Sequence, residues 1–337
     1  MPNATLTQVA EHAGVSLATA SRVLNGSDRH PAATIADRVK ASAETLGYLP
    51  NAQAQALARA STSMIGLVVH DIADPYFSSI AKGVQLAAAA GGRQVLLSAA
   101  GTAVEAAPAM LQAVRAFASH RTEAIILAGT RTTTGPKTLQ PALRAYLDRG
   151  GRLVTIGQAW FKGASAVRLG NRRGTRELVS ALTADGQSRF AYLAGPSSLR
   201  TQEDRFGGYQ DGIRAAGAEH LGLFRGEFNA EGGRAAAREL LREMRPTVRR
   251  PVTVLAGNDV MALGAVGVFL DAGLTIGRQV RVAGFDDIDQ LADSRPQLTT
   301  YRLPLQRIGE LAAGLALDPD QADPPLVTGE VIRRETA

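Results

Sequence analysis

The chain has 337 residues, a net charge of +6, 45% hydrophobic residues and 20% charged residues. This composition is typical of a folded protein with two or three folding units, and it excludes a disordered chain. With no cysteine, disulfides, zinc–thiolate sites and thiol nucleophiles are excluded. The first residues lack a basic segment followed by an apolar run, and no apolar run reaches the length of a membrane span. We therefore expect a cytoplasmic protein that has no membrane partner.

The net charge carries little information about a nucleic-acid partner. Residues 1–60 contain five Lys or Arg and four Asp or Glu, so this segment has a net charge of only +1. A case for binding an anionic polymer must therefore rest on the pattern of residues.

Residues 4–48 are predicted to form short helices. Thr5 and Gln8 match a capping box, in which the threonine hydroxyl and the glutamine side chain satisfy each other's backbone N–H groups. One apolar face then follows, made of Leu6, Val9, Ala10 and Ala13. Gly14 predicts the end of this first helix.

Ser16 is predicted to cap a second helix that runs to about Leu24. Its inward positions are Ala20, Val23 and Leu24, and its outward positions are Leu17, Ala18, Ser21 and Arg22. A helix, a three-residue turn and a helix form a helix-turn-helix, whose second helix fits the major groove of DNA. There Arg22 can pair with guanine, while leucine and alanine can contact a thymine methyl. The alternative is a plain three-helix bundle in which Arg22 is a solvated charge.

Residues 49–63 form a polar connector. Pro50 favours an extended entry, and Asn51 is a good N-cap for residues 52–58. Seven residues make a helix that is marginal alone in water. From the residues alone, a flexible linker with an incidental Leu57 remains the alternative.

From Met64 onward, apolar runs are separated by segments long enough for helices. We expect strands at 64–69, 94–97, 124–128, 153–156, 190–194, 252–256 and 280–285. Strands that alternate with helices indicate parallel α/β sheets, and their uninterrupted apolar sequences indicate sheets covered on both faces.

The signatures of catalysis are missing from the sequence. The five histidines show no i, i+3 or i, i+4 pair, and no GxGxxG after the first strand, GxxxxGK[ST] or GxSxG motif is present. We therefore expect neither an enzyme nor a metal or other cofactor.

The segments AGVSLATASRVLNG (13–26) and LGYLPNAQAQALA (46–58) together resemble the headpiece of the lactose-repressor (LacI/GalR) family. The resemblance continues in RFGGYQDGI (205–213), LAGNDVMALGAV (255–266) and VAGFDDI (282–288). It implies an all-α helix-turn-helix headpiece followed by a core like the periplasmic binding proteins, with two Rossmann-like lobes.

The implied domains are a headpiece at 1–49, a hinge at 50–63 and an effector-binding and dimerisation core at 64–337. Within the core, we expect an N-lobe at about 64–159 and 303–318, and a C-lobe at about 162–300 and 322–335. Three crossovers would join these lobes near 159–162, 300–303 and 318–322.

By the same resemblance, we expect a homodimer that binds a pseudo-palindromic operator, with Leu57 inserted as a wedge in the minor groove. The expected DNA-binding residues are Thr5, Ser16, Leu17, Ala18, Thr19, Ser21, Arg22, Asn25, Asn51, Gln55 and Leu57. A small-molecule effector is expected between the lobes, at the carboxyl ends of strands. Its expected contacts are Tyr76, Phe77, Gln158, Thr201, Arg205, Phe228, Asn258 and Asp286.

Each effector position has a plainer interpretation. Arg205 could be a salt-bridge partner, Asp286 a helix cap and Phe77 a core residue. The chain also departs from the family pattern. The stretch 25–39 is one residue longer, Gln55 stands where many members have arginine, and Gly157 stands where some sugar-binding members have aspartate.

Gly170 and Leu303 likewise replace polar residues of some members, so the effector stays open among a pyranose, a pentose, a sugar phosphate and a nucleobase, with a sugar favoured. The resulting hypothesis is a transcriptional repressor controlled by a sugar. The alternatives are a cytoplasmic solute receptor with no DNA role and a corepressor-type regulator that responds to a nucleobase.

Overall fold

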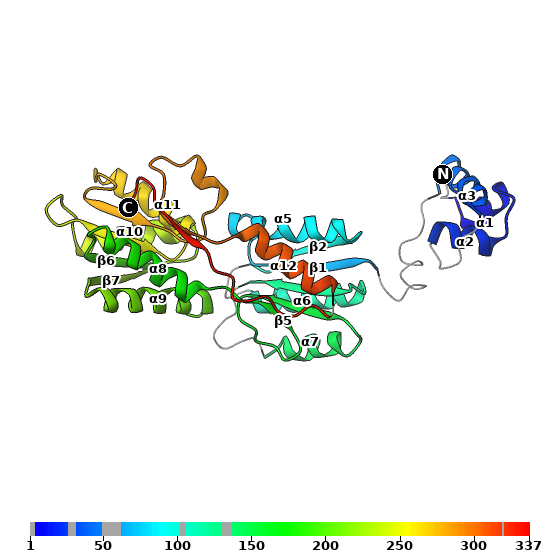
Figure 1. Cartoon of the computed structure of the whole chain (residues 1–337), viewed down its shortest axis with the longest axis horizontal. Coiled ribbons are helices and arrows are strands. Elements are labelled where there is room, and N and C mark those ends of the chain that lie inside the picture. Colours follow the sequence, from blue (N-terminus) through cyan, green and yellow to red (C-terminus); the bar gives the residue numbers. More distant parts are fainter. Residues whose placement is uncertain (1–3, 26–31, 49–61, 102–105, 130–136, 319) are drawn as a thin grey trace. The chain divides into compact units, whose positions relative to one another are not determined.

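The computed structural model describes residues 4–25, 32–48, 62–101, 106–129, 137–318 and 320–337. The chain divides into two compact units, Met1–Ser63 and Met64–Ala337, which are described separately (Figure 1).

In the first unit, three helices pack around a small apolar core. They are α1 (Leu6–His12), α2 (Leu17–Asn25) and α3 (Ala33–Thr45). The predicted capping box is present, because Thr5 accepts from the backbone of Gln8 while the Gln8 side chain accepts from the backbone of Thr5. Gly14 has a φ of +62°, which glycine adopts at little cost where α1 must turn sharply toward α2. The buried core consists of Val9, Ala10, Ala13, Ala20, Val39 and Ala43.

The second unit contains two parallel sheets. The N-lobe sheet has the order β2-β1-β3-β4-β5. Its strands are β1 (Met64–Val69), β2 (Gln94–Ala99), β3 (Ala124–Ala128), β4 (Arg152–Ile156) and β5 (Ser165–Val167). The C-lobe sheet has the order β7-β6-β8-β9 and contains β6 (Arg189–Ala194), β7 (Glu219–Arg225), β8 (Val252–Ala256) and β9 (Val280–Ala283).

Helices cover both faces of the N-lobe sheet. The helices α5 (Pro75–Ala90) and α12 (Leu305–Leu317) pack side by side on one face, and α6 (Ala106–Ser119) and α7 (Gln140–Leu147) pack on the other (Figure 1). Alternate residues of β3 accordingly enter different cores: Ile126 packs with the α5 and α12 side, and Leu127 with the α6 and α7 side. The α5 and α12 backbones approach so closely at Gly83 that a Cβ there would overlap the Gln306 carbonyl.

The C-lobe repeats this arrangement. The helices α8 (Asn171–Ala184) and α9 (Arg200–Ala216) pack together, as do α10 (Ala230–Glu243) and α11 (Asp259–Asp271). A short η1 helix (Asp289–Ala292) follows β9, and β10 (Thr300–Arg302) pairs antiparallel with β11 (Glu330–Ile332). Helices on both faces of parallel sheets are the architecture that the alternating strand and helix segments predict.

Two crossover positions differ from those expected. β5 pairs with β4 in the N-lobe sheet, so the first crossover follows it at residues 168–170 and not at 159–162. Asp323 still accepts from the backbone of Ala166 in that lobe, which moves the third crossover from 318–322 to about 327–329. The N-lobe therefore includes residues beyond 159 and beyond 318. The second crossover, expected at 300–303, lies at 303–304, between β10 and α12.

The sequence pattern also failed to predict some of the strands and predicted one strand that is too long. The strands β5, β10 and β11 have only three residues each, and β7 is only partly buried. None of these four has the long apolar run by which the seven expected strands were identified. The strand expected at 280–285 ends at Ala283, and the backbone then turns, with positive φ values at Asp286 and Asp287. In the described parts of the chain, the structure contains no helix with the length and apolar character needed to cross a membrane.

Candidate functional site

The α2 helix presents one face to solvent. Leu17 is 50% exposed, which is unusual for a large apolar side chain, and Ala18 and Arg22 are also exposed. Ala20, on the opposite face, is fully buried in the small core. The predicted cap is present, since Ser16 Oγ lies 3.1 Å from the backbone nitrogen of Thr19. The helix therefore offers a row of accessible side chains on a fixed support.

Arg22 can provide donors on this face, and it makes no ion pair with the part of the headpiece that the structure describes. Thr19 and Ser21 are half-buried beside it, and Thr5 is exposed at the start of α1. Asn51, Gln55 and Leu57 lie outside the described residues, as does the side chain of Asn25. The DNA contacts of all these residues stay predictions.

Two cavities lie between the lobes of the second unit. We call the first the Trp160 chamber. It offers only about 30 Å³ to a water-sized molecule and is lined by Phe77, Gln158 and Trp160 from one lobe and by Thr201 and Asp204 from the other.

We call the second cavity the Phe228 chamber. It offers about 450 Å³ to a water-sized molecule and is lined by Asp71, Asp74 and Phe77 from one lobe and by Glu227 and Phe228 from the other. Phe77 lines both cavities, so they are adjacent parts of one cleft.

Local structure at strand ends positions the aromatic residues of the cleft. After β1, Asp74 caps α5 by accepting from the backbone of Tyr76 at 2.9 Å, and Pro75 begins the helix. This cap places Tyr76 and Phe77 in the first turn, where their rings meet edge to face with centroids 4.9 Å apart. Burial is the main reason that the pKa of Asp74 is raised.

A polar bridge crosses the cleft. Gln158 follows β4 through Gly157, whose φ is +110°, and its Nε2 donates to Asp204 Oδ2 at 3.2 Å. The other carboxylate oxygen of Asp204 lies 3.1 Å from Arg200 Nε. Burial raises the pKa of Asp204. Because Gln158 belongs to the N-lobe and Asp204 to α9 of the C-lobe, this bond joins the two lobes across the cleft.

Arg205 and Asp286 form a buried ion pair. The two nitrogens Nη1 and Nη2 of Arg205 donate to the two carboxylate oxygens at 3.2 and 2.6 Å. Arg205 also donates to Asn171 Oδ1 at 3.0 Å and to the Gly257 carbonyl at 2.7 Å, and it lies 4.0 Å from the centroid of Phe285. Each residue is only 3% exposed. Such a pair holds its two side chains in one arrangement, because separating them would leave two buried charges unpaired at a high cost in free energy.

Arg205 is therefore a salt-bridge partner, which is the plainer of the two interpretations that the sequence allowed. Burial raises the pKa of Asp286 to about 7, although the Arg205 guanidinium opposes the rise. Burial, with Asp286 nearby, also raises the pKa of Tyr76. Neither Arg205 nor Asp286 is among the residues that line the two chambers, so their contact with an effector stays a prediction.

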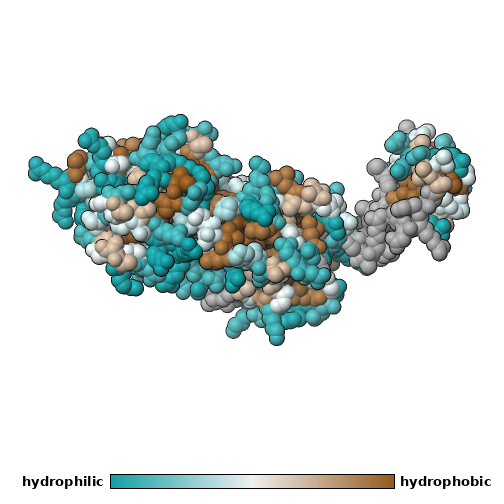
Figure 2. Space-filling view, in the orientation of Figure 1, coloured by the Kyte–Doolittle hydropathy of each residue, from teal (hydrophilic) through white to brown (hydrophobic). Residues whose placement is uncertain are grey.

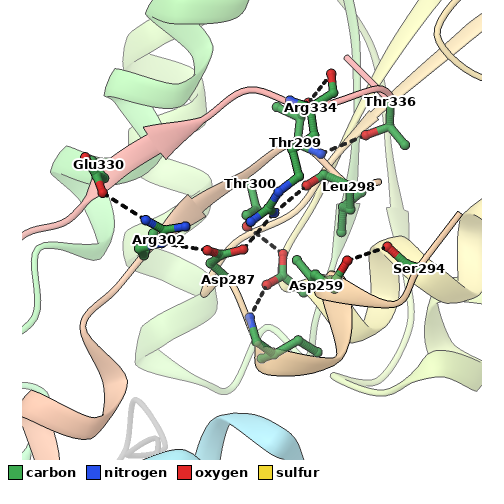
Figure 3. A network of polar contacts seen from close by, with 12 residues as sticks. Asp259, Asp287, Ser294, Leu298, Thr299, Thr300, Arg302, Glu330, Arg334 and Thr336 are labelled. Carbon is green, nitrogen blue, oxygen red and sulfur yellow. Dashed lines mark hydrogen bonds and ion pairs between the residues drawn. The ribbon is translucent and has the colours of Figure 1, made fainter. Parts of the chain in front are cut away.

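A polar network fixes the loop that carries Asp286 (Figure 3). The adjacent Asp287 accepts from Arg302 at 2.7 Å and pairs with Arg334 at 2.7 Å. Arg302 also donates to Glu330, so both crossover strands are tied to this loop. Asp259 accepts from Thr300 Oγ1 at 2.6 Å, and burial raises its pKa to about 6.

Asn258 and Phe228 occupy different environments. Asn258 Oδ1 caps α11 by accepting from the backbone of Met261 at 2.9 Å, and the residue is buried outside the chamber linings. Phe228 is half-buried, and its ring lies over Gly195 and Gly257, where any Cβ would collide with it. The two glycines therefore leave the space that the Phe228 ring occupies.

Sequence reasoning gave no role to Asp204 and Arg200 and did not place Trp160 and Asn171 in the cleft. Arg200 and Asp204 are spaced i, i+4 at the start of α9, directly before Arg205, and that spacing was an available signal. No group of three acidic or histidine side chains that could hold a metal ion occurs among the described residues.

Two family models match the chain. Residues 5–51 match the bacterial regulatory proteins of the lacI family, and residues 179–337 match the periplasmic binding protein-like domain. These matches cover the two parts of the expected fold class and confirm it, together with the solved structures below.

Three similar proteins span nearly the whole chain. The transcriptional regulator GalR of Escherichia coli K12 is 34% identical over 93% of this chain and 88% of its own length. The lac repressor dimer, solved with operator and the anti-inducer ONPF, is 25% identical, covers 99% of this chain and 98% of its own, and has a TM-score of 0.84. The CelR–cellobiose complex is 27% identical, covers 99% and 100%, and has a TM-score of 0.68.

Proposed function

Because the chain belongs to the LacI family of bacterial transcription regulators, we propose that it is a repressor whose operator affinity is controlled by a small molecule held between the two lobes. The expected molecule is a sugar or a sugar derivative. The observation that carries this proposal is the interlobe cleft, which is lined from both lobes in a chain that also carries a helix-turn-helix headpiece. No cofactor is needed for such a function.

Two solved structures of similar proteins support both halves of the proposal. The lac repressor dimer was solved with operator, and CelR was solved with cellobiose. In this chain the exposed face of α2 suits a DNA groove, while the aromatic and hydrogen-bonding side chains of the cleft suit a hydroxylated ring.

Exposed apolar surface on the second unit supports a homodimer. Leu86 on α5, Leu97 on β2 and Leu270 on α11 are 51%, 42% and 46% exposed. β2 is also an edge of its sheet, and Figure 2 shows brown apolar areas on one face of this unit. Exposed apolar areas often mark association surfaces, and a dimer suits a pseudo-palindromic operator because one headpiece reads one half-site.

The proposed control acts through the separation of the lobes. An effector that enters the interlobe cleft would compete with or reinforce the Gln158–Asp204 bridge, and so change the preferred lobe arrangement. We propose that the hinge at 50–63 transmits this change and that Leu57 inserts into operator DNA. By reciprocity, operator DNA and an inducing effector weaken each other's binding by the same factor.

The proposal is tested by selecting genomic fragments with the purified protein and measuring their affinity by fluorescence anisotropy, with and without a panel of sugars. A selected fragment should bind tightly at physiological salt and be released by one sugar. Leu57→Ala should weaken binding and reduce DNA bending together. Equal binding to all fragments would contradict the proposal, and a tightly bound fragment that no sugar releases would reject induction by a sugar.

A further inference from the structure

The Phe228 chamber is the larger of the two cavities between the lobes. It offers about 450 Å³ to a water-sized molecule, and typical ligand pockets have volumes of roughly 300–1,000 Å³. The adjoining Trp160 chamber offers only about 30 Å³, so a ligand that enters the cleft in this lobe arrangement must lie in the Phe228 chamber. The side chains that line this chamber therefore decide which class of small molecule the cleft accepts.

Apart from His70, the ionisable side chains that line the Phe228 chamber are acidic. Asp71 and Asp74 come from the segment after β1, and Glu227 comes from the segment after β7 on the opposite lobe. The lining contains no lysine or arginine. His70 lies 3.2 Å from the Gly101 carbonyl through Nδ1, and a neutral imidazole can make this contact with its one N–H group. The chamber therefore gathers negative charge from both lobes.

Local hydrogen bonds occupy only part of these carboxylates. Oδ1 of Asp71 accepts from the backbone of Ala73 at 2.8 Å, and Oδ1 of Asp74 accepts from the backbone of Tyr76 at 2.9 Å. Within the described part of the chain, none of the three carboxylates forms an ion pair. Burial is the main cause of the raised pKa of Asp74, and the charge of Asp71 adds to it. A cation in the chamber would supply the partner that these oxygens lack.

The arginines beside the cleft do not neutralise this charge. Arg200 lies 3.1 Å from Asp204, and Arg205 lies 2.6 Å from Asp286, so both guanidinium groups already have carboxylate partners. Neither arginine lines the Phe228 chamber. A phosphate or carboxylate ligand would therefore meet three acidic side chains and no available cation, which disfavours its binding.

Aromatic rings form further walls of the chamber. Phe77 and Phe228 line it, one from each lobe. The face of an aromatic ring carries partial negative charge and attracts an ammonium group, while its apolar surface contacts the carbon atoms beside the nitrogen. Carboxylates combined with aromatic faces thus suit an organic ammonium ion better than a neutral molecule of the same shape.

We propose that the effector of this protein is an organic cation whose ammonium group occupies the Phe228 chamber, between the carboxylates of Asp71, Asp74 and Glu227. An amino sugar or another hydroxylated amine has this chemistry. The inference rests on the proposed function, and it narrows the effector of the same cleft to a positively charged molecule.

Calorimetric titration of the full-length protein with ligands that differ in charge tests this proposal. Glucosamine and galactosamine are compared with glucose, galactose and the N-acetyl forms, which are neutral, and with glucuronate and galacturonate, which are anionic. At least one amine should bind about tenfold or more tightly than its neutral and anionic counterparts. Added salt should weaken its binding, because salt screens the attraction between charges.

Amines without a sugar ring identify the source of the ammonium group. Ethanolamine and putrescine are titrated alongside the amino sugars under the same conditions. Tighter binding of an amino sugar supports an effector with a ring, and tighter binding of a ring-free amine supports a simple amine. Both results support an ammonium site in the Phe228 chamber.

Two variants that remove charge locate the ammonium group. Asp74→Asn keeps a side-chain oxygen that can cap α5, and Glu227→Gln keeps the size of the side chain. Each should reduce the preference for the amine over its neutral counterpart about fivefold or more, whereas structural damage alone would weaken both ligands alike. Glu239→Gln is the matched control, because this exposed residue of α10 lies outside the chamber lining and should leave the preference unaltered.

The proposal is overturned if no amine binds more tightly than its neutral counterpart, or if an anion binds most tightly. An unaltered preference in both charge-removing variants would also overturn it. Operator binding is measured on the same samples. If selective operator binding is retained while the amine results fail, only this inference fails, whereas loss of selective DNA binding contradicts the proposed function itself.

Discussion

The candidate DNA-binding face and the candidate effector cleft are built in opposite ways. The exposed face of α2 lies within a short stretch from Ser16 to Arg22, supported by a capping bond between residues three apart. In the cleft, the bridging bond joins residues 46 apart, and the buried Arg205–Asp286 pair outside the chamber linings joins residues 81 apart. The first site is thus a property of one helix, and the second is a property of two lobes.

Burial differs as sharply between these sites. Arg22 is exposed, while Arg205 is 3% exposed and makes hydrogen bonds to three different residues. A solvated charge can be removed at little cost to folding, but removing one partner of a buried pair leaves the other unpaired. The comparison therefore predicts that variants of the buried Arg205–Asp286 pair change stability, while variants on the exposed face of α2 change recognition.

The largest effect is expected from Arg205→Ala. The Asp286 carboxylate would lose its partner in a buried site, and the second unit should lose about 3–5 kcal/mol of unfolding free energy. Urea denaturation followed by Trp160 fluorescence measures this loss. Arg172→Ala is the matched control, because its ion pair with Asp211 is exposed and should contribute little. Similar losses in the two variants would contradict the structural importance of the buried pair.

The stability of the second unit should depend on pH through Asp259, which begins α11 and accepts a hydrogen bond from Thr300. Burial raises the pKa of Asp259 from its ordinary value of 3.8 to about 6 in the folded protein. Between these values the folded state holds a proton that the unfolded chain has released, so the contribution of this carboxyl to stability falls as pH rises. The wild type should therefore lose about 2–3 kcal/mol relative to Asp259→Asn as pH rises from about 4 to about 6.

The measurement is the difference between the urea unfolding free energies of the two proteins across that window. Asp211→Asn gives a control of opposite sign, because Arg172 lowers the pKa of Asp211 and its stabilising contribution is lost as pH falls. A constant difference between the wild type and Asp259→Asn from pH 4 to 7 would contradict the assignment.

Replacing Arg22 tests the DNA-binding face. Arg22→Ala should cost about 1–3 kcal/mol of binding free energy per half-site and relax base preference at one position, with stability unchanged. Binding to a set of operator variants measures both effects. Lys40→Ala removes an exposed charge from α3 instead and should weaken binding without changing base preference. Unaltered selectivity of the Arg22 variant would exclude this residue from base readout.

The smallest effect is expected at the α1 cap. Thr5→Ala removes the capping oxygen and should lower headpiece stability by about 1 kcal/mol. Thr7→Ala, on the exposed side of the same helix, should leave stability equal or slightly higher, since alanine favours helices. Thermal unfolding of the headpiece transition separates the two. Equal melting temperatures would show that the capping box contributes nothing measurable.

The sequence alone determined the local parts of this protein. The Thr5–Gln8 box, the turn at Gly14 and the exposed positions of α2 follow from residue spacing, because a helix fixes the relation between residues a few positions apart. The long apolar strands were equally readable, and two separated headpiece motifs predicted the family that the comparisons confirm.

Only the tertiary structure decided how the cleft is assembled. A sequence cannot reveal that Gln158 bonds to Asp204 across the lobes, or that Phe77 stands between two chambers, since those relations depend on how separate sheets pack. The same reason explains the misplaced first crossover: the three residues of β5 carry too little hydrophobic pattern to predict a strand, and β4 pairs with them only in the folded sheet.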